Sequence, residues 1–108
     1  MNRGDVVLVA GKGAYSRKPR PALIVQSDLF NATHASVSLC LITSELHDAP
    51  LFRLTVHPDE ANGLHQPSQI MIDKLFSAPR SGLTRRIGSI SSALMQEVDA
   101  ALRAWFDL

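Results

Sequence analysis

The sequence of 108 residues has one cysteine, no long apolar run and almost no excess of charge. A single cysteine can form neither a disulfide within the chain nor a cysteine-based zinc site, so disulfide-stapled scaffolds are excluded. No stretch approaches the roughly 20 apolar residues that a membrane-spanning helix requires, and the charged N-terminal segment is not typical of a signal peptide. We therefore expect one cytoplasmic globular domain, residues 1–108, with no membrane contact.

Familiar metal and nucleotide motifs are also missing. The histidines follow none of the usual metal-ligand spacings; they are His34, His47, His57 and His65. We expect them mostly on surface loops, although His57 or His65 could reach a site through the fold. Gly11 to Gly13 lacks the further spacing of a phosphate-binding loop, and Cys40 lies in an apolar strand where a thiol usually packs. We expect no metal and no other cofactor.

The formal net charge is only +1, but the charged residues are unevenly distributed along the chain. Residues 11–20 and 74–86 form two basic islands with four basic and no acidic residues each, whereas residues 45–60 are mainly acidic. The islands contain Lys12, Arg17, Lys18 and Arg20, and Lys74, Arg80, Arg85 and Arg86. This layout permits a polyanionic partner on one face, although solvated basic loops are common.

Short apolar runs bounded by turn signals predict about five strands: Asp5 to Ala10, Ala22 to Gln26, Ser36 to Thr43, Leu54 to Val56 and Gln69 to Asp73. In the third run, alternation puts Val37, Leu39, Leu41 and Thr43 on one face. Two flanking prolines favour extended chain around Arg20, which places this arginine at a strand entrance. Residues 27–31 predict a turn or a single helical turn.

The last segment changes to helical spacing behind two candidate N-caps, Ser91 and Ser92. Its apolar stripe consists of Leu94, Val98, Ala101, Leu102 and Trp105. Strands followed by one packing helix predict an α+β fold, a small antiparallel, partly barrel-like sheet of five to six strands with a C-terminal helix. Because so small a sheet exposes its edges, a homodimer is expected.

Several segments follow one another in a distinctive order over nearly the whole chain: Arg3 to Val9, Arg20 to Asn31, Leu41 to Ser44, Ser68 to Phe76, and Arg86 to Ser91 with the residues up to Leu102. In this order they resemble the MazF/PemK family of toxin endoribonucleases, which share their fold with the CcdB toxins. The resemblance places Ser68 to Phe76 in the family's fifth strand and Arg86 onward in its closing helix.

The resemblance implies a homodimer that cleaves single-stranded RNA at a short sequence without a metal, inhibited by a cognate antitoxin that we expect to be acidic. It implies a catalytic pair of Arg20 and Thr43, and a weaker match gives Asp73 as a base. The first loop, Gly11 to Pro19, matches the segment that gates RNA access. The candidates for RNA binding are Lys12, Tyr15, Ser16, Arg17, Lys18, Asn31, Lys74, Phe76 and Arg80.

RNA supplies its own nucleophile, the 2′-hydroxyl, so the protein must hold the strand in line, stabilise the phosphorane and manage protons. Arg20 suits stabilisation because its guanidinium forks onto two phosphate oxygens, and acid catalysis is a second role open to it. Its high pKa in solution makes it a poor base. Thr43 can donate a hydrogen bond to the same phosphate. The expected products carry 2′,3′-cyclic phosphate and 5′-hydroxyl ends. Many relatives have Gln and Arg where this chain has Lys74 and Phe76, so base preference is expected to differ.

Two alternatives stay open. A gyrase-poisoning toxin of the CcdB kind would use a C-terminal tryptophan, but Trp105 falls on the apolar stripe and is expected in the core. A non-catalytic member would bind RNA or an antitoxin without turnover. Without the resemblance, Arg20 is a solvated strand-end cation and Thr43 an ordinary strand residue.

Overall fold

The structure, a computed structural model, describes residues 1–10 and 18–108. Six strands form one antiparallel sheet in the order β4-β5-β3-β2-β1-β6. The elements along the chain are β1 (Asp5–Val9), β2 (Arg20–Ile24), α1 (Asp28–Asn31), β3 (Ser36–Thr43), β4 (Arg53–Val56), β5 (Ser68–Pro79), the 3₁₀ turn η1 (Arg80–Gly82), β6 (Leu83–Ser89) and α2 (Ser92–Phe106). The predicted α+β fold with a C-terminal helix is confirmed.

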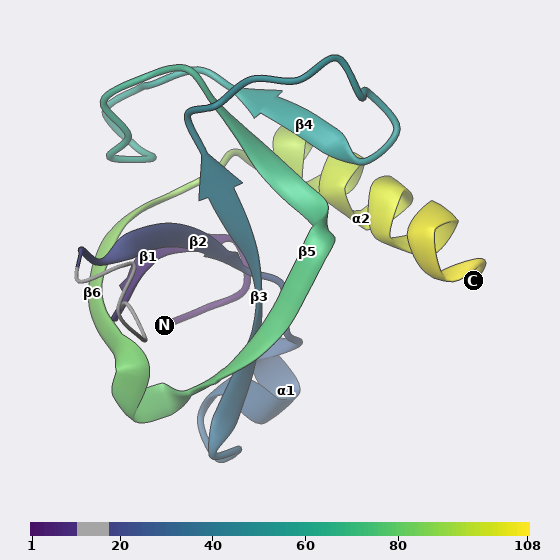
Figure 1. The fold of residues 1–108 in the computed structure, drawn as a ribbon. Helices are drawn as coiled ribbons and strands as arrows, with labels where there is room; N and C mark the ends of the chain where they lie inside the picture. Colours follow the sequence, from purple (N-terminus) through teal and green to yellow (C-terminus); the bar gives the residue numbers. More distant parts are fainter. Residues whose placement is uncertain (11–17) are drawn as a thin grey trace.

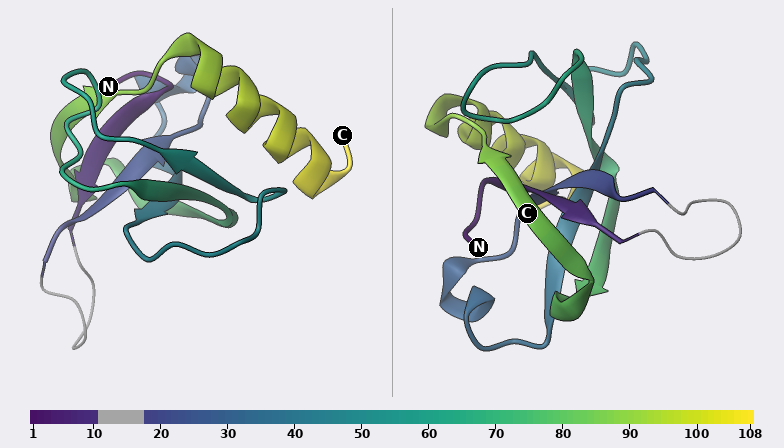
Figure 2. Two further views of the ribbon diagram at one scale, coloured as in Figure 1. Left: turned by 90° about the horizontal axis from the view of Figure 1, so that it is seen from above. Right: turned by 90° about the vertical axis from the view of Figure 1, so that its left-hand side faces the viewer.

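The sheet is strongly curled but does not close. Strand β5, twelve residues long, runs from beside β4 past β3 and bends into η1 and β6 (Figure 1). Strand β6 then pairs with β1, so that β4 and β6 are the two edge strands of the sheet. Helix α2 lies on the side of the sheet where β4 and the first part of β5 are found (Figures 1 and 2). The fold is therefore a partial barrel with one helix packed outside it.

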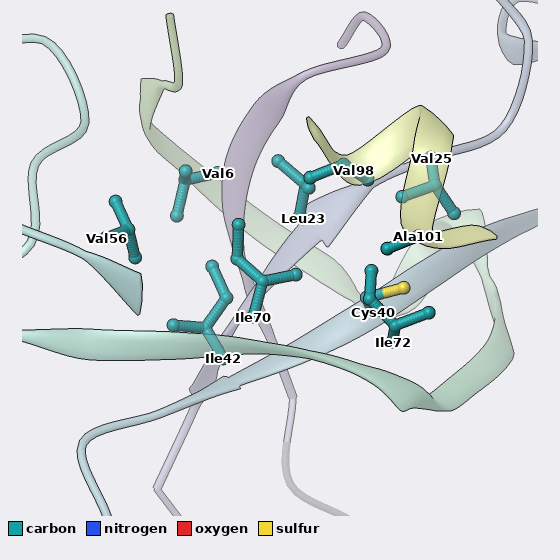
Figure 3. Close-up of a cluster of buried hydrophobic side chains, with 10 residues drawn as sticks. All are labelled: Val6, Leu23, Val25, Cys40, Ile42, Val56, Ile70, Ile72, Val98 and Ala101. Atoms are coloured by element: carbon teal, nitrogen blue, oxygen red, sulfur yellow. The ribbon is translucent and has the colours of Figure 1, made fainter. Parts of the chain in front are cut away.

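The central strands bury both of their faces. One hydrophobic cluster lies between the sheet and α2 (Figure 3) and consists of Val6, Leu23, Val25, Cys40, Ile42, Val56, Ile70, Ile72, Val98 and Ala101. The alternate residues of the same strands form a second cluster, made of Val7, Val9, Ala22, Ile24, Val37, Leu39 and Ala78. Side chains of a strand point alternately to opposite faces, so neighbours such as Val6 and Val7 enter different clusters. Apolar residues on both faces hold the central strands rigidly, which fixes the strand ends.

The predicted alternation of β3 is confirmed as far as Leu41. Val37 and Leu39 belong to the second cluster, and Leu41 packs against it. A register shift between Cys40 and Ile42 in the pairing with β5 accompanies the burial of both residues in the first cluster. Cys40 is fully buried, and desolvation, followed by the charge of Asp73, raises the pKa of its thiol to about 12. Its predicted packing role is confirmed.

The assignment of Arg86 to Ser91 to the closing helix is wrong. Arg86 to Ser89 belong to β6, an edge strand that pairs with β1 through two register shifts, between Val6 and Val7 and between Leu8 and Val9. The irregular pairing and the exposed arginines disturb the period-2 pattern expected of a strand. Helix α2 begins afterwards, at Ser92, where the Oγ of Ser91 accepts a hydrogen bond from the Leu94 amide at 3.1 Å. The N-cap prediction is thus confirmed for Ser91.

Strand β5 extends beyond the predicted Asp73 to Pro79 because its second half pairs with β3, from Leu75 opposite Cys40 to Pro79 opposite Ser36. The single helical turn expected at residues 27–31 is α1. In the two described ranges, no helix combines the length and the apolar character needed to cross a membrane.

Candidate active site

Strand register brings Arg20 and Thr43 together. The β2–β3 ladder pairs Ala22 with Leu41. Two residues further along each antiparallel strand, Arg20 and Thr43 therefore fall at the same level and on the same face. Arg20 also stands opposite Val9 of β1. The pair lies where β2 begins and β3 ends, at the boundary between the buried sheet and the open surface.

Two cavities meet at this pair, and both are lined by Arg20, Ile42 and Thr43. The first, here the apolar cavity, has a volume of about 420 Å³ and is completed by Val9, Ala10, Leu41, Met71, Phe76, Ser77 and Ala78. The second, here the polar cavity, has a volume of about 540 Å³ and is completed by Leu8, Pro21, Ser44, Gly63, Leu64, His65, Gln66, Ser68, Arg85 and Ile87. The polar cavity is named for its larger share of polar side chains, including Arg85, His65 and Gln66. An apolar recess beside such a mixed one suits a ligand with a planar base and a charged backbone.

Thr43 is oriented by its own strand end. Its side chain is half-buried, and Oγ1 accepts a hydrogen bond from the Glu45 amide at 3.1 Å. Because that bond uses a lone pair of the oxygen, the hydroxyl hydrogen is still able to donate to a ligand. Arg20, at the start of β2, is exposed and carries its charge into the same region. Together they offer a fixed hydroxyl donor and a guanidinium to one anion.

One wall of the polar cavity is the β4–β5 loop, residues 57–67, and buried Asn62 organises this loop from within. The Asn62 side chain is 2% exposed. Its Oδ1 accepts from the amides of Asp59 and Leu64 at 3.2 and 3.0 Å, and its Nδ2 donates to the His57 carbonyl at 2.8 Å. Such a complete set of bonds fixes the loop conformation.

Two glycines allow the same loop to pack closely against β6. Gly63 has φ +70°, and a Cβ there would lie 2.2 Å from the carbonyl oxygen of Ile87. A Cβ at Gly88 would lie 2.2 Å from the carbonyl oxygen of Ala61. The Ser89 amide donates to that same Ala61 oxygen at 2.8 Å. The loop is therefore bound closely to the strand that carries Arg85, and both contribute to the polar cavity.

Asp73 is not brought to the pair. Arg53 of β4 donates from Nε to Oδ1 at 2.9 Å and from Nη2 to Oδ2 at 3.1 Å, and the two side chains are only 13% and 15% exposed. Asp73 lines neither cavity. The hydrogen bonds from Arg53 hold the pKa of the Asp73 carboxyl below its usual range, against the opposing effect of burial. The carboxylate thus joins β4 to β5 and is poorly placed to act as the base.

The residues predicted to bind RNA are divided. Lys12, Tyr15, Ser16 and Arg17 lie outside the described residues. Phe76 lines the apolar cavity, next to the pair. Lys18 and Lys74 are exposed and line neither cavity.

Asn31 and Arg80 lie elsewhere and are engaged in structural bonds. Asn31 is 8% exposed and donates to the Gln26 carbonyl and to Asp28 at 3.0 and 2.8 Å, which ties α1 to the end of β2. Arg80 donates from both Nε and Nη2 to the carbonyl of His34. Neither residue lines the two cavities at the pair, because the turns α1 and η1 are found at the other end of β3 (Figure 1).

Further residues that were not predicted to bind RNA also line the two cavities. Gln66 and Arg85 line the polar cavity, and Met71 lines the apolar one. Arg85 belongs to the second basic island, which was the signal available for it. The sequence allows His65 to reach a site through the fold, and the structure places it in the lining of the polar cavity. His57 lines a different cavity, with Asn62 and the start of α2.

The family model described as "PemK-like, MazF-like toxin of type II toxin-antitoxin system" matches residues 2–106. The chain belongs to the PemK/MazF toxin family. Among its relatives, "Probable endoribonuclease MazF" of Mycolicibacterium smegmatis is 47% identical over 102 residues, covering 94% of this chain and 93% of the relative. "Endoribonuclease MazF6" of Mycobacterium tuberculosis is 33% identical over 97 residues, covering 89% and 85%.

Solved structures of PemK/MazF toxins share the fold. "Mycobacterium tuberculosis toxin MazF-mt6" superimposes with a TM-score of 0.81 at 24% identity, over 96% of this chain and 97% of that one. "Endoribonuclease in complex with its cognate antitoxin from Mycobacterial species" gives a TM-score of 0.83 at 21% identity, over 100% and 96%. The curled sheet and C-terminal helix are therefore the architecture of these toxins.

Within this PemK/MazF fold, the expected burial of Trp105 is wrong. Its side chain is 48% exposed, and its ring meets that of Phe52 with centroids 5.6 Å apart and planes tilted by 53°. Val98 and Ala101, about two turns and one turn earlier, are the residues of α2 that enter the core. The end of α2 extends beyond the strands (Figure 1), so the last residue of the stripe is only partly covered.

Proposed function

We propose that this chain is the endoribonuclease of a type II toxin–antitoxin pair and that it cuts single-stranded RNA at Arg20 and Thr43. The observation that carries the proposal is the position of this pair between an apolar and a polar cavity in a chain of the PemK/MazF family. The relatives from Mycolicibacterium and Mycobacterium are named endoribonucleases, which supports the same activity here.

The two cavities suit an unpaired strand of RNA. A base lifted out of its stack can enter the apolar cavity against Phe76 and Met71, where base stacking on an aromatic ring contributes about 1–3 kcal/mol. The scissile phosphate then reaches Arg20 and Thr43, and the following nucleotide occupies the polar cavity beside Arg85. A paired base has no free face to offer the apolar cavity, so single-stranded RNA is preferred.

The reaction needs an in-line attack by the ribose 2′-oxygen on the phosphorus, followed by departure of the 5′-oxygen. Arg20 stabilises the added negative charge of the phosphorane with two N–H donors, and Thr43 donates to another phosphate oxygen. Because the guanidinium supplies the positive charge, this scheme includes no metal ion. The products are a 2′,3′-cyclic phosphate and a 5′-hydroxyl.

The proposal extends to the partners of the chain. One solved neighbour is described as an endoribonuclease with its cognate antitoxin, and another as MazE–MazF from Deinococcus radiodurans. We expect this chain to form a homodimer, supported by its unpaired sheet edges β4 and β6, and to be inhibited by an acidic antitoxin that neutralises Arg20 and Arg85. Its place of action is the cytoplasm, where messenger RNA is found.

The activity is tested with purified protein and one mixed-sequence RNA, labelled at its end, in excess chelator. The RNA is offered as a single strand and annealed to its complement. We expect discrete cuts at a recurring short sequence in the single strand and far slower cleavage of the duplex. Intact single-stranded RNA at micromolar protein, or equal cutting of both forms, contradicts the proposal.

A further inference from the structure

We infer that His65 is the general acid of this reaction and protonates the 5′-oxygen as it leaves the scissile phosphate. The inference rests on the proposed ribonuclease function and adds a proton donor for the leaving oxygen to the roles of Arg20 and Thr43.

The position of His65 is the first argument. It lines the polar cavity together with Arg20 and Thr43, although it comes from the β4–β5 loop, more than twenty residues away along the chain. Asn62 and the close contact of Gly63 with Ile87 fix this loop against β6, as described above. His65 is therefore exposed to the cavity on a backbone that is held in place, which is what a catalytic side chain requires.

The second argument is that the imidazole of His65 is available to a ligand. Within the described residues, the His65 side chain makes no hydrogen bond and no ion pair, in contrast to His34 and His47. One ring nitrogen can therefore hold a proton for the substrate while the other faces water.

The third argument is the chemistry of the other groups in the two cavities. Among the described residues that line them, none is a carboxylate. Arg20 from β2 and Arg85 from β6 are the charged groups that face the same cavity, and a guanidinium does not release its proton in the neutral range. Serine and threonine hydroxyls are weak acids. An imidazole is the side chain that exchanges a proton near neutral pH.

The direction of the RNA agrees with this role. If the base before the cut fills the apolar cavity, the leaving nucleotide lies in the polar cavity, on the side of His65. The O2′–P bond forms and the P–O5′ bond breaks, and its electron pair goes to O5′, which takes a proton from the imidazolium. The proton of the 2′-hydroxyl goes to solvent, and solvent reprotonates the imidazole.

The test compares two substrates that differ at one atom. Once the cut is mapped, one oligonucleotide keeps oxygen at the 5′-bridging position and the other has sulfur there, because a thiolate leaves without being protonated. His65→Gln keeps the polarity and approximate size of the side chain, and His57→Gln is the matched control because His57 lines a different cavity. Cleavage is measured from pH 5 to pH 9, and far-UV circular dichroism checks that each variant is folded.

We expect His65→Gln to slow cleavage of the oxygen substrate by about 10²–10⁴-fold and of the sulfur substrate far less. The wild-type rate should also fall on the alkaline side, and this limb should be absent in His65→Gln. His57→Gln should match the wild type. A His65→Gln variant that cuts both substrates at the wild-type rate, or that slows both equally, overturns the inference.

The two proposals fail in different ways. If the wild type cuts neither substrate, the ribonuclease function itself fails. If the wild type cuts both, and Arg20→Ala slows both while His65→Gln shows no preference for sulfur, the ribonuclease stands and His65 is not its acid.

Discussion

Arg53 binds both carboxylate oxygens of Asp73, with Nε–Oδ1 at 2.9 Å and Nη2–Oδ2 at 3.1 Å. The pair connects the edge strand β4 to β5, and it is nearly covered. A carboxylate held in this way stabilises the sheet and stays ionised at neutral pH, and it is not free to accept a proton from the 2′-hydroxyl. For the reaction proposed above, we therefore expect the acid–base chemistry to come from another group.

The first prediction concerns the pH dependence of stability. The pKa of Asp73 is lowered in the folded state, so its contribution is present above its unfolded value of about 4 and is lost as pH falls through the lower folded value. Arg53→Met should reduce the free energy of unfolding by about 1–3 kcal/mol at pH 7, and by less near pH 3. Denaturant titrations at both pH values measure this. An equal loss at both would show that Arg53 acts only through packing.

The second prediction concerns the close approach of β6 to the β4–β5 loop. A Cβ at position 88 would clash with backbone atoms of Ala61 and Asn62, so the loop would have to shift away from β6. Gly88→Ala should cost about 1–3 kcal/mol of stability and should slow cleavage, since the displaced loop carries His65. Gly82→Ala is the control, because its Cβ would meet only Pro79 Cγ at 3.9 Å. Thermal unfolding and cleavage rates that are equal for the two variants would refute the prediction.

The third prediction is electrostatic. Arg85 lines the polar cavity and should contact one phosphate of bound RNA. Arg85→Ala should weaken RNA binding and reduce the salt dependence of the logarithm of affinity by about one unit of slope. Arg103→Ala, on α2 and away from both cavities, should leave the slope unchanged. Fluorescence anisotropy between low and high salt gives the slopes, and an unchanged slope for Arg85→Ala would place the phosphate elsewhere.

The fourth prediction separates the ribonuclease from a gyrase poison. Trp105 is half exposed and its ring contacts that of Phe52. Trp105→Ala should therefore reduce the free energy of unfolding by about 0.5–1.5 kcal/mol for the lost ring contact, in addition to the loss of its buried apolar surface. RNA cleavage should stay intact. Growth arrest in cells should survive Trp105→Ala and disappear with Arg20→Ala. The reverse pattern would favour the alternative in which the exposed tryptophan contacts a protein target.

Strong local patterns made much of this fold predictable. The β-branched runs from Asp5 and from Ser36 became β1 and β3, and Ser91 caps α2 as expected. Strand β6 was missed because Thr84, Arg85 and Arg86 are polar residues on an edge, where pairing with β1 and not burial holds the strand. The prediction for Trp105 was wrong because helical spacing predicts which face of α2 is apolar, but not how far along the helix the sheet covers that face.

The site was predictable only in part. The Arg20–Thr43 pair followed from the family resemblance, and strand register explains why two residues far apart in sequence meet. Asp73 has a carboxylate that could act as a base, but nothing near it in the sequence indicates that Arg53 would bind both of its oxygens. His65 and Gln66 lie on a loop with no motif, and only the topology of the sheet brings that loop to the pair.

The most direct measurement identifies the ends of cleaved RNA for the wild type, Arg20→Ala and Thr43→Val, with Thr43→Ser as the control that keeps the hydroxyl. In excess chelator, we expect wild type and Thr43→Ser to leave 2′,3′-cyclic phosphate and 5′-hydroxyl ends. Arg20→Ala and Thr43→Val should be slower by about 10²–10³-fold, the usual cost of removing one preorganised donor. Cleavage that persists in both variants, or that leaves 5′-phosphate ends, would place the chemistry away from Arg20 and Thr43.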